Sequence, residues 1–144
     1  MSSDLTSAEA LTESLGRLAL FADLAPEALA ALTATVRDVR FDQGTWILLE
    51  GNENADLFVI LEGDVGLVHD EVEHAVLHAG MFFGEVSVLL DETAVAGFVA
   101  RTPVHCAVID RAALVPFLLA NPSVIMRLLQ AEVRRLADAF PWRA

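Results

Sequence analysis

Short apolar runs separated by glycine occupy the middle of this 144-residue chain, and they restrict its fold more than any other feature. Each run is three to six residues long and rich in Val, Ile, Leu or Phe, which is typical of strands. The runs are Trp46–Leu49, Leu57–Leu61, Val65–Val68, Ala75–Leu77, Phe98–Ala100 and Val104–Ile109. Glycines at positions 44, 51, 63, 80 and 84 fall where turns are expected. Short strands at this spacing predict an all-β sandwich or barrel over residues 39–110.

Helical periodicity precedes the strand region. Ser7 is a candidate helix cap, and apolar residues then recur at helical spacing from Leu11 to Phe21. Pro26 is placed to start a second helix, whose period continues to Val36. We therefore expect helices across residues 7–37.

Two further helices are expected after the strand region, across residues 111–140. Asp110 is a candidate cap for a helix over residues 111–120, and the Asn121-Pro122-Ser123 segment ends that helix and starts the next. The whole chain, residues 1–144, is thereby predicted to form one domain.

The last helix carries apolar residues at the spacing of a coiled-coil seam. The residues of this seam are Met126, Leu129, Val133, Leu136 and Phe140. One interpretation is a helix that packs only on its own barrel. The other, which we favour, is a helix with a second face that forms a homodimer.

The charge balance excludes some partners. Nine arginines, no lysine and 21 carboxylates give a formal net charge of −12. Such a chain repels nucleic acid and acidic membrane surfaces, so neither is an expected partner. The single cysteine, Cys106, excludes a disulfide framework, and its apolar neighbours predict a buried side chain rather than a redox or haem ligand.

The apolar content, 55% of residues, raises the question of a membrane segment. The longest uncharged stretch in the C-terminal half, residues 112–126, is interrupted by Pro116, Asn121 and Pro122. A spanning helix needs about 20 predominantly apolar residues, so this stretch is interpreted as two short buried helices. The N-terminus lacks the pattern of a signal peptide. The sequence therefore predicts a cytoplasmic location.

The strongest local pattern is GMFFGEVSVLLD, residues 80–91. Gly84 and Glu85 follow an aromatic pair and indicate a strand that ends at a tight turn. The apolar residues behind them predict one short helix. Backbone N–H groups at the start of such a helix suit a phosphate.

Together with three motifs upstream, this pattern resembles the cyclic nucleotide-binding domain family, which includes sensor halves of catabolite-activator-type regulators and regulatory subunits of kinases. The upstream motifs are Leu20-Phe21-Ala-Asp-Leu24, Phe41-Asp-Gln-Gly44-Thr-Trp-Ile47-Leu-Leu-Glu50-Gly51 and Phe58-Val-Ile-Leu61-Glu-Gly63. The resemblance covers residues 11–140. It implies an α+β fold: an eight-stranded antiparallel, jelly-roll-like β-roll flanked by N-terminal helices and a long C-terminal helix. Regulators of this family usually continue into a DNA-reading domain, so we expect this chain to be a free-standing module without one.

The chain departs from the family at the phosphate. In binding members an arginine after the Gly-Glu pair contacts the cyclic phosphate, a small hydroxyl residue follows it, and the glutamate bonds the ribose 2′-hydroxyl. Aligned without gaps, the arginine and hydroxyl positions fall on Ala94 and Gly97. If a cyclic nucleotide binds, the expected contacts are Gly84, Glu85, Val86 and Ser87, with Arg101 as the nearest arginine.

Three functions follow as hypotheses. We favour a non-enzymatic regulatory or protein-interaction module that has lost nucleotide binding, with Glu85 as a helix cap and a pocket filled by Val86, Leu89, Val95 and Phe98. One alternative is a functional receptor for cyclic AMP or cyclic GMP. The other is a cupin-like, metal-dependent enzyme that uses the region of His69 and Glu73, although the His-x-His pair of cupins is missing. No catalytic residue, metal or cofactor is predicted.

Overall fold

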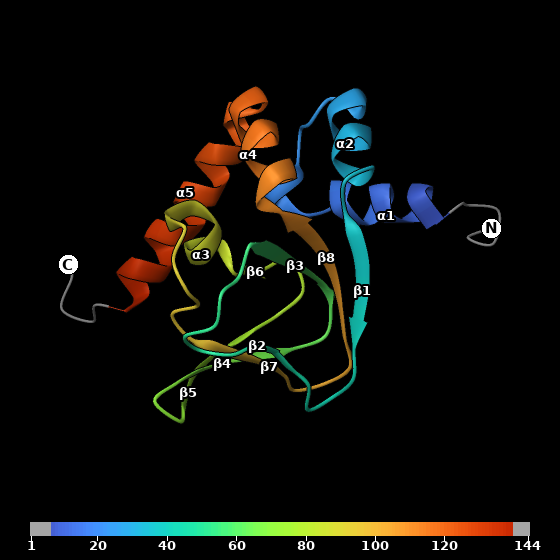
Figure 1. The fold of residues 1–144 in the computed structure, drawn as a ribbon. Coiled ribbons are helices and arrows are strands. Elements are labelled where there is room, and N and C mark those ends of the chain that lie inside the picture. The colour runs from blue at the N-terminus through green and yellow to red at the C-terminus, as the bar shows by residue number, and fades with distance from the viewer. Residues whose placement is uncertain (1–6, 140–144) are drawn as a thin grey trace.

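A computed structural model describes residues 7–139 as two facing four-stranded antiparallel sheets with helices at both ends of the chain (Figure 1). The first sheet has the strand order β1 (Arg37–Phe41), β8 (Val104–Asp110), β3 (Asp56–Glu62) and β6 (Phe82–Phe83). The second has the order β2 (Trp46–Leu48), β7 (Gly97–Ala100), β4 (Val65–His69) and β5 (Val72–Leu77). The predicted α+β fold with eight antiparallel strands is confirmed.

The central strands of the first sheet are buried on both faces. Side chains alternate along a strand, so one set points to the second sheet and the other to the helices. In β3 and β8 the first set is Phe58, Ile60, Cys106 and Val108, and the second is Leu57, Val59, Ala107 and Ile109. This two-sided burial explains why both strands are continuous apolar runs in the sequence.

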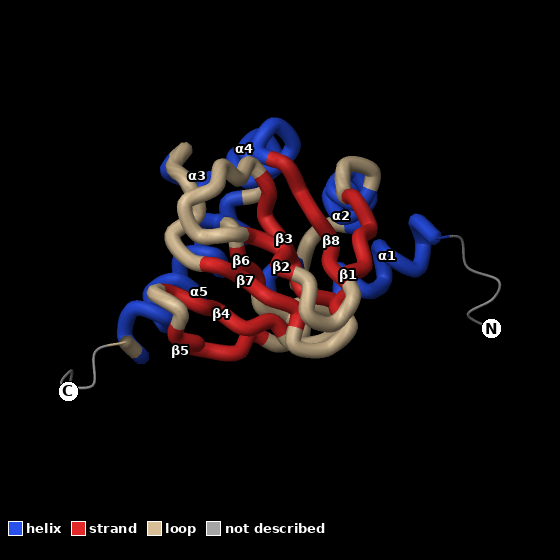
Figure 2. The backbone as a smooth tube through the Cα atoms, turned by 60° about the horizontal axis from the view of Figure 1, so that its bottom comes forward, coloured by secondary structure: helices blue, strands red, loops and turns tan. Residues whose placement is uncertain are grey.

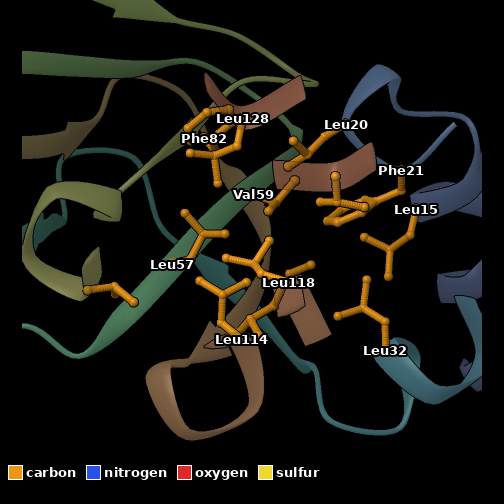
Figure 3. Packing of buried hydrophobic residues seen from close by; sticks show 14 of the residues in the cluster. Leu15, Leu20, Phe21, Leu32, Leu57, Val59, Phe82, Leu114, Leu118 and Leu128 are labelled. Atoms are coloured by element: carbon orange, nitrogen blue, oxygen red, sulfur yellow. The ribbon is translucent and has the colours of Figure 1, made fainter. Parts of the chain in front are cut away.

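The helices cover the outer face of the first sheet. α1 (Ser7–Gly16), a 3₁₀ turn η2 (Ala19–Phe21) and α2 (Pro26–Thr33) come from the N-terminal part. α4 (Arg111–Ala120) and α5 (Pro122–Asp138) come from the C-terminal part. Figure 3 shows their buried side chains, among them Leu15, Phe21 and Leu114, gathered against Leu57 and Val59 of β3.

The N-terminal helical region is shorter than predicted. The period that continued to Val36 placed helix up to residue 37, but α2 ends at Thr33 and β1 starts at Arg37. The Thr33 and Thr35 hydroxyls bond the carbonyls of Leu29 and Leu32 as the helix ends. Val36 packs against the same helix-side core. An apolar residue is therefore required at this position whether the backbone is helical or extended.

The residues in the turns and helix caps explain how neighbouring elements are connected. Asp70 and Glu71 join β4 to β5 as a two-residue hairpin loop, both with positive φ. Asp110 caps α4 as predicted, because its Oδ1 accepts a hydrogen bond from the Ala113 N–H at 2.9 Å. Pro122 starts α5, which turns by 110° from α4.

Within residues 7–139 no single helix has the length and apolar character to cross a membrane. The bent pair of α4 and α5, taken together, meets the length and composition of a membrane span.

α5 (Pro122–Asp138) has two apolar faces. Val124 and Leu128 are buried against the helix-side core. On the other face, the predicted seam residues Met126, Leu129, Val133 and Leu136 are each more than half exposed. Phe140, the last predicted seam residue, lies outside the described residues. The end of α5 lies on the same side of the molecule as β4 and β5 (Figure 2).

Candidate functional site

A cavity of about 680 Å³ opens between the second sheet, the segment from residue 84 to 96 and the C-terminal end of α5. Leu67, Leu77 and Phe98 supply apolar side chains from the sheet. The charged side chains at the cavity wall include Glu85 from α3 (Glu85–Leu90) and Arg135 from α5. The cavity therefore combines an apolar body with a polar end.

Gly84 turns the chain from β6 into α3 and thereby positions Glu85. Its φ is +89°, in the left-handed region that favours glycine. A Cβ at this position would lie 2.5 Å from the Asp56 carbonyl oxygen and 3.0 Å from Asn54 Nδ2. Only a residue without a side chain fits here, so the glycine fixes where α3 begins.

Glu85 is buried and bound by an arginine from another element. Its side chain is 8% exposed, and its Oε1 accepts a hydrogen bond from Arg135 Nη1 at 2.9 Å. The same nitrogen lies 3.2 Å from Glu132 Oε1, and Arg135 Nη2 donates to the Phe82 carbonyl. The guanidinium also lies 4.5 Å from the centre of the Phe82 ring. Arg135 is thus committed to partners within the protein.

The second oxygen of Glu85 has a different environment. Oε2 is buried and has no hydrogen-bond partner among the residues that the structure describes. Burial and the neighbouring Glu132 carboxylate raise the pKa of Glu85, Arg135 lowers it, and the net value is about 7. Glu85 is therefore a buried carboxyl group with one unpaired oxygen and a pKa of about 7.

The prediction that Glu85 caps the short helix is wrong about its main partner. Glu85 is the first residue of α3, but its carboxylate forms its ion pair with Arg135, fifty residues further along the chain. Arg135 was missed in the sequence. One local signal could have indicated it. Arg135 lies between Val133 and Leu136 in the sequence but not on their helix face, so its side chain points away from the seam.

Four of the five predicted ligand contacts lie together. Gly84, Glu85, Val86 and Ser87 all line the cavity. Arg101, expected as a contact only if a cyclic nucleotide binds, is not among the residues that line the cavity. Arg101 follows β7 on the outer side of the second sheet, where its Nε lies 2.5 Å from Glu73 Oε1. Gly66 leaves room for this pair, since a Cβ there would lie 2.3 Å from that carboxylate oxygen.

The positions aligned with the family's phosphate-binding side chains offer no polar group to the cavity. Ala94 is 5% exposed and lines the cavity with a methyl group. Its backbone pairs with the loop after β2, through hydrogen bonds of 2.8 Å to Asn52 and Gly51. Gly97 faces the other way, because a Cβ there would lie 2.8 Å from the Trp46 ring on the outer side. Neither position 94 nor position 97 therefore presents a charged or hydroxyl side chain to the cavity.

The expectation that apolar side chains fill the pocket is wrong. Val86, Val95 and Phe98 line the open cavity instead of closing it. Leu89 is 46% exposed and does not belong to the lining, because it lies on the outward face of α3. These side chains leave a space whose size suits a small molecule.

The residues of the cupin-like hypothesis are separated. His69 lines the cavity rim and lies 3.1 Å from Glu50, whereas Glu73 pairs with Arg101 on the outer side. The alternation of side chains along the β4–β5 hairpin produces this separation. Glu50, His69 and Asp70 do bring ligand atoms within 4.8 Å of one another, but all three are exposed.

Cys106 has the environment predicted for it. It is fully buried between the two sheets, and burial raises the pKa of its thiol to about 12. The thiolate required of a nucleophile or a metal ligand is strongly disfavoured there.

A second arginine holds the other end of α3. Arg111, the first residue of α4, donates from Nε to the Val88 carbonyl and from Nη2 to the Ser87 carbonyl, both at 2.9 Å. Its Nη1 also lies 3.1 Å from Asp91. Both C-terminal helices are therefore bonded to the short helix that walls the cavity.

Known proteins are similar to this chain in sequence and in fold. Residues 38–121 match the sequence profile of the family described as the cyclic nucleotide-binding domain. A CRP-like cAMP-activated global transcriptional regulator of Mycobacterium tuberculosis is 29% identical over 131 residues, 88% of this chain and 58% of that protein. The chain thus spans less than two thirds of that relative's length.

Two solved structures extend the comparison. The N-terminal domain of a transcriptional regulator from Streptomyces coelicolor A3(2) is 32% identical, with a TM-score of 0.65, over 88% of this chain and 92% of that one. The regulatory subunit of a cAMP-independent protein kinase A from Trypanosoma brucei is 26% identical, with a TM-score of 0.77, over 86% of this chain and 45% of that one.

Proposed function

The chain belongs to the cyclic nucleotide-binding domain family, and from that premise we propose that it is a non-enzymatic regulatory module whose pocket does not bind cyclic AMP or cyclic GMP. The observation that carries this proposal is the buried Ala94 methyl at the position where the resemblance places the phosphate-binding arginine. A charge-assisted hydrogen bond is worth roughly 1.5–3 kcal/mol, and it is often bidentate when arginine meets phosphate.

The state of Glu85 supports the same conclusion. In binding members the matching glutamate bonds the ribose, whereas here one of its oxygens is bound by Arg135. Arg135 also lines the cavity, but it donates to Glu85, Glu132 and the Phe82 carbonyl. Recruiting this arginine to a phosphate would leave a buried carboxylate without its cation, which is costly.

We further propose that the module has no catalytic activity. The regulatory relatives favour a module that is not an enzyme, and the buried Cys106 thiol offers no reactive nucleophile. We place the module in the cytoplasm, in line with the expectation from its sequence.

We also propose that the module works as a homodimer through α5. Four seam residues with a 3–4 spacing are more than half exposed, and an apolar stripe of this kind stabilises a helix pair when a second copy covers it. In a dimer with a two-fold axis, each copy contributes the same patch to the interface, so the apolar stripe of one copy would pack against the apolar stripe of the other.

A receptor for cyclic nucleotides is the second candidate. The observation that favours it is the open cavity of about 680 Å³, which a domain without any ligand would be expected to lose. The M. tuberculosis relative is itself described as cAMP-activated, whereas the T. brucei relative is described as cAMP-independent.

Calorimetric titration of the purified protein with cyclic AMP and cyclic GMP separates the two candidates. We expect no saturable heat even at millimolar nucleotide. Saturation at micromolar affinity would overturn the proposal and support the receptor.

A further inference from the structure

We propose that the outer face of the second sheet is a docking surface for a protein partner, and that Trp46 and the acidic side chains around it hold an arginine of that partner. In Figure 1 the described helices lie above the second sheet, and the face below it is left open. Because this face lies away from the pocket, its role does not depend on which ligand the pocket takes. Two properties of the face point to such a partner: an exposed tryptophan held against the sheet, and an excess of carboxylates.

Trp46 provides an aromatic platform at the start of β2. Its indole lies over Gly97 of the neighbouring strand β7, where a Cβ would be 2.8 Å from the Trp46 Cζ3 atom. The indole thus packs on the backbone of β7, yet 48% of the Trp46 surface is exposed to solvent. A tryptophan that is held in place and still exposed is the kind of residue that dominates the binding energy of protein interfaces.

A groove of about 690 Å³ lies beside Trp46 on this face. Leu49, which is 49% exposed, and the half-buried Val68 of β4 add apolar surface to the groove. Neighbouring apolar side chains that stay exposed in this way mark sites of interaction. A partner segment can therefore bury apolar surface here as well as place a charge.

Carboxylates outnumber cations around the groove. Glu50 comes from the loop after β2, Glu71 from the β4–β5 loop and Glu73 from β5. Arg101 is the one arginine among the described lining residues, and its Nε lies 2.5 Å from Glu73 Oε1. Glu50 lies 3.1 Å from His69 Nδ1, whereas Glu71 has no ion pair with any described residue. The groove therefore carries an excess of negative charge, which a cationic group would neutralise.

This charge selects the kind of partner. It repels a second copy of the same face, nucleic acid and acidic membranes, and it attracts a basic protein segment. Arginine suits the groove better than lysine, because its planar guanidinium stacks on an indole and bonds a carboxylate through two nitrogens. The apolar stem of an arginine, or an apolar residue next to it, would cover Leu49 and Val68.

Two tripeptides test this assignment: Ac-Arg-Leu-Arg-NH2, and the same peptide with the uncharged analogue citrulline in place of both arginines. We would follow the NMR signals of the Trp46 indole N–H and of the Val68, Gly97 and Arg101 amides, in about 0.15 M salt to screen long-range attraction. We expect these signals to shift saturably with the arginine peptide, which should bind at least about tenfold more tightly than the citrulline peptide. No shift at these residues, or equal affinity of the two peptides, would overturn the inference.

Two double variants of equal net charge locate the binding. Glu50→Gln/Glu71→Gln removes two carboxylates of the groove, whereas Glu27→Gln/Glu62→Gln removes two exposed carboxylates from α2 and β3. The first should weaken binding of the arginine peptide at least about fivefold, and the second less than about twofold. Equal effects of the two would show that the peptide responds to net charge alone and would contradict the site.

The platform is tested by Trp46→Leu, which keeps an apolar side chain over Gly97 but removes the aromatic ring. The arginine peptide should bind this variant at least about threefold more weakly, because the stacking of the guanidinium is lost. Unchanged affinity in folded W46L would contradict the role of Trp46. Glu50 and Glu71 are exposed, so the carboxylate variants remain decisive if W46L does not fold.

Discussion

Glu85 is the central charged residue of the site, and its carboxyl group is buried where water does not solvate its ionised form. Burial, the largest cause, and Glu132 raise its pKa, Arg135 lowers it, and the net value is about 7. Because the folded-state pKa is higher than the ordinary value of 4.5, the folded protein holds a proton that the unfolded chain has already lost. The contribution of Glu85 to stability is therefore largest below pH 4.5 and is lost as the pH rises through about 7.

The first prediction compares wild-type protein with Glu85→Gln, which stays neutral at every pH. Between pH 5 and pH 8, the unfolding free energy of the wild type should fall relative to that of E85Q by roughly 2–3 kcal/mol. Urea unfolding at the two pH values measures the difference. Glu73→Gln serves as the control, and its difference from wild type should be nearly constant. A wild type that gains stability over E85Q towards pH 8 would contradict the assigned environment of Glu85.

The second prediction concerns Gly84. Gly84→Ala adds a Cβ that meets the Asp56 carbonyl at 2.5 Å, and it does so at a positive φ. We expect a loss of about 3 kcal/mol or more, because steric overlap adds to the backbone strain. Gly44→Ala is matched in φ but meets nothing within 4 Å, so it should lose only about 1–2 kcal/mol. Equal losses in thermal or urea unfolding would show that the close approach at Gly84 is not the cause.

The sequence allowed us to predict the position of a site residue where that position depends on the residues next to it in the chain. Gly84 and Glu85 could be placed at the site because a glycine turn followed by a short helix is a local pattern. Arg135 could not, because its contact with Glu85 joins residues fifty positions apart. Arg101 was misplaced since its distance from the motif along the chain did not reveal which face of the sheet its side chain would occupy.

Among the elements, α3 is the one most dependent on its neighbours. It is six residues long, too short to be stable alone, and its Leu89 and Leu90 are exposed. Arg135 binds its first residue, and Arg111 binds the carbonyls of Ser87 and Val88. The wall of the cavity is therefore held in place from α4 and α5.

The third prediction tests this anchoring with Arg111→Met, which keeps much of the side-chain length but removes the donors. We expect a loss of about 2 kcal/mol, because two carbonyl hydrogen bonds to a charged donor disappear. Amide hydrogen exchange in α3 should accelerate at the same time. Arg40→Met, which alters an exposed pair at 4.0 Å, should change stability by less than about 0.5 kcal/mol. Unchanged exchange in α3 would refute the anchoring role.

Element types were easier to predict than element ends. The strands β3 and β8 were clear as apolar runs because they are buried on both faces. The end of α2 was predicted too late, because Val36 is needed in the core just after the helix has ended. Helical spacing alone does not show whether an apolar side chain continues a helix or packs into the core just after the helix has ended.

For the whole molecule, the exposed apolar face of α5 is the surface through which we propose that the homodimer forms. Leu129→Arg places a charge in the proposed seam, so the dimer should weaken at least about tenfold. Leu119→Arg is the matched control, since Leu119 is 72% exposed on α4 and outside the seam. Sedimentation equilibrium measures both. A wild-type monomer at high concentration would contradict the homodimer, and equal effects of the two variants would contradict the seam.

We propose that the pocket rejects cyclic nucleotides because position 94 lacks a cation. Calorimetric titration of the wild type and of Ala94→Arg with cyclic AMP measures the effect of a cation at this position. We expect no saturable binding to the wild type and a gain of at least about tenfold in the variant, as for one charge-assisted pair. Micromolar binding to the wild type, or a folded A94R variant that gains nothing, would contradict it.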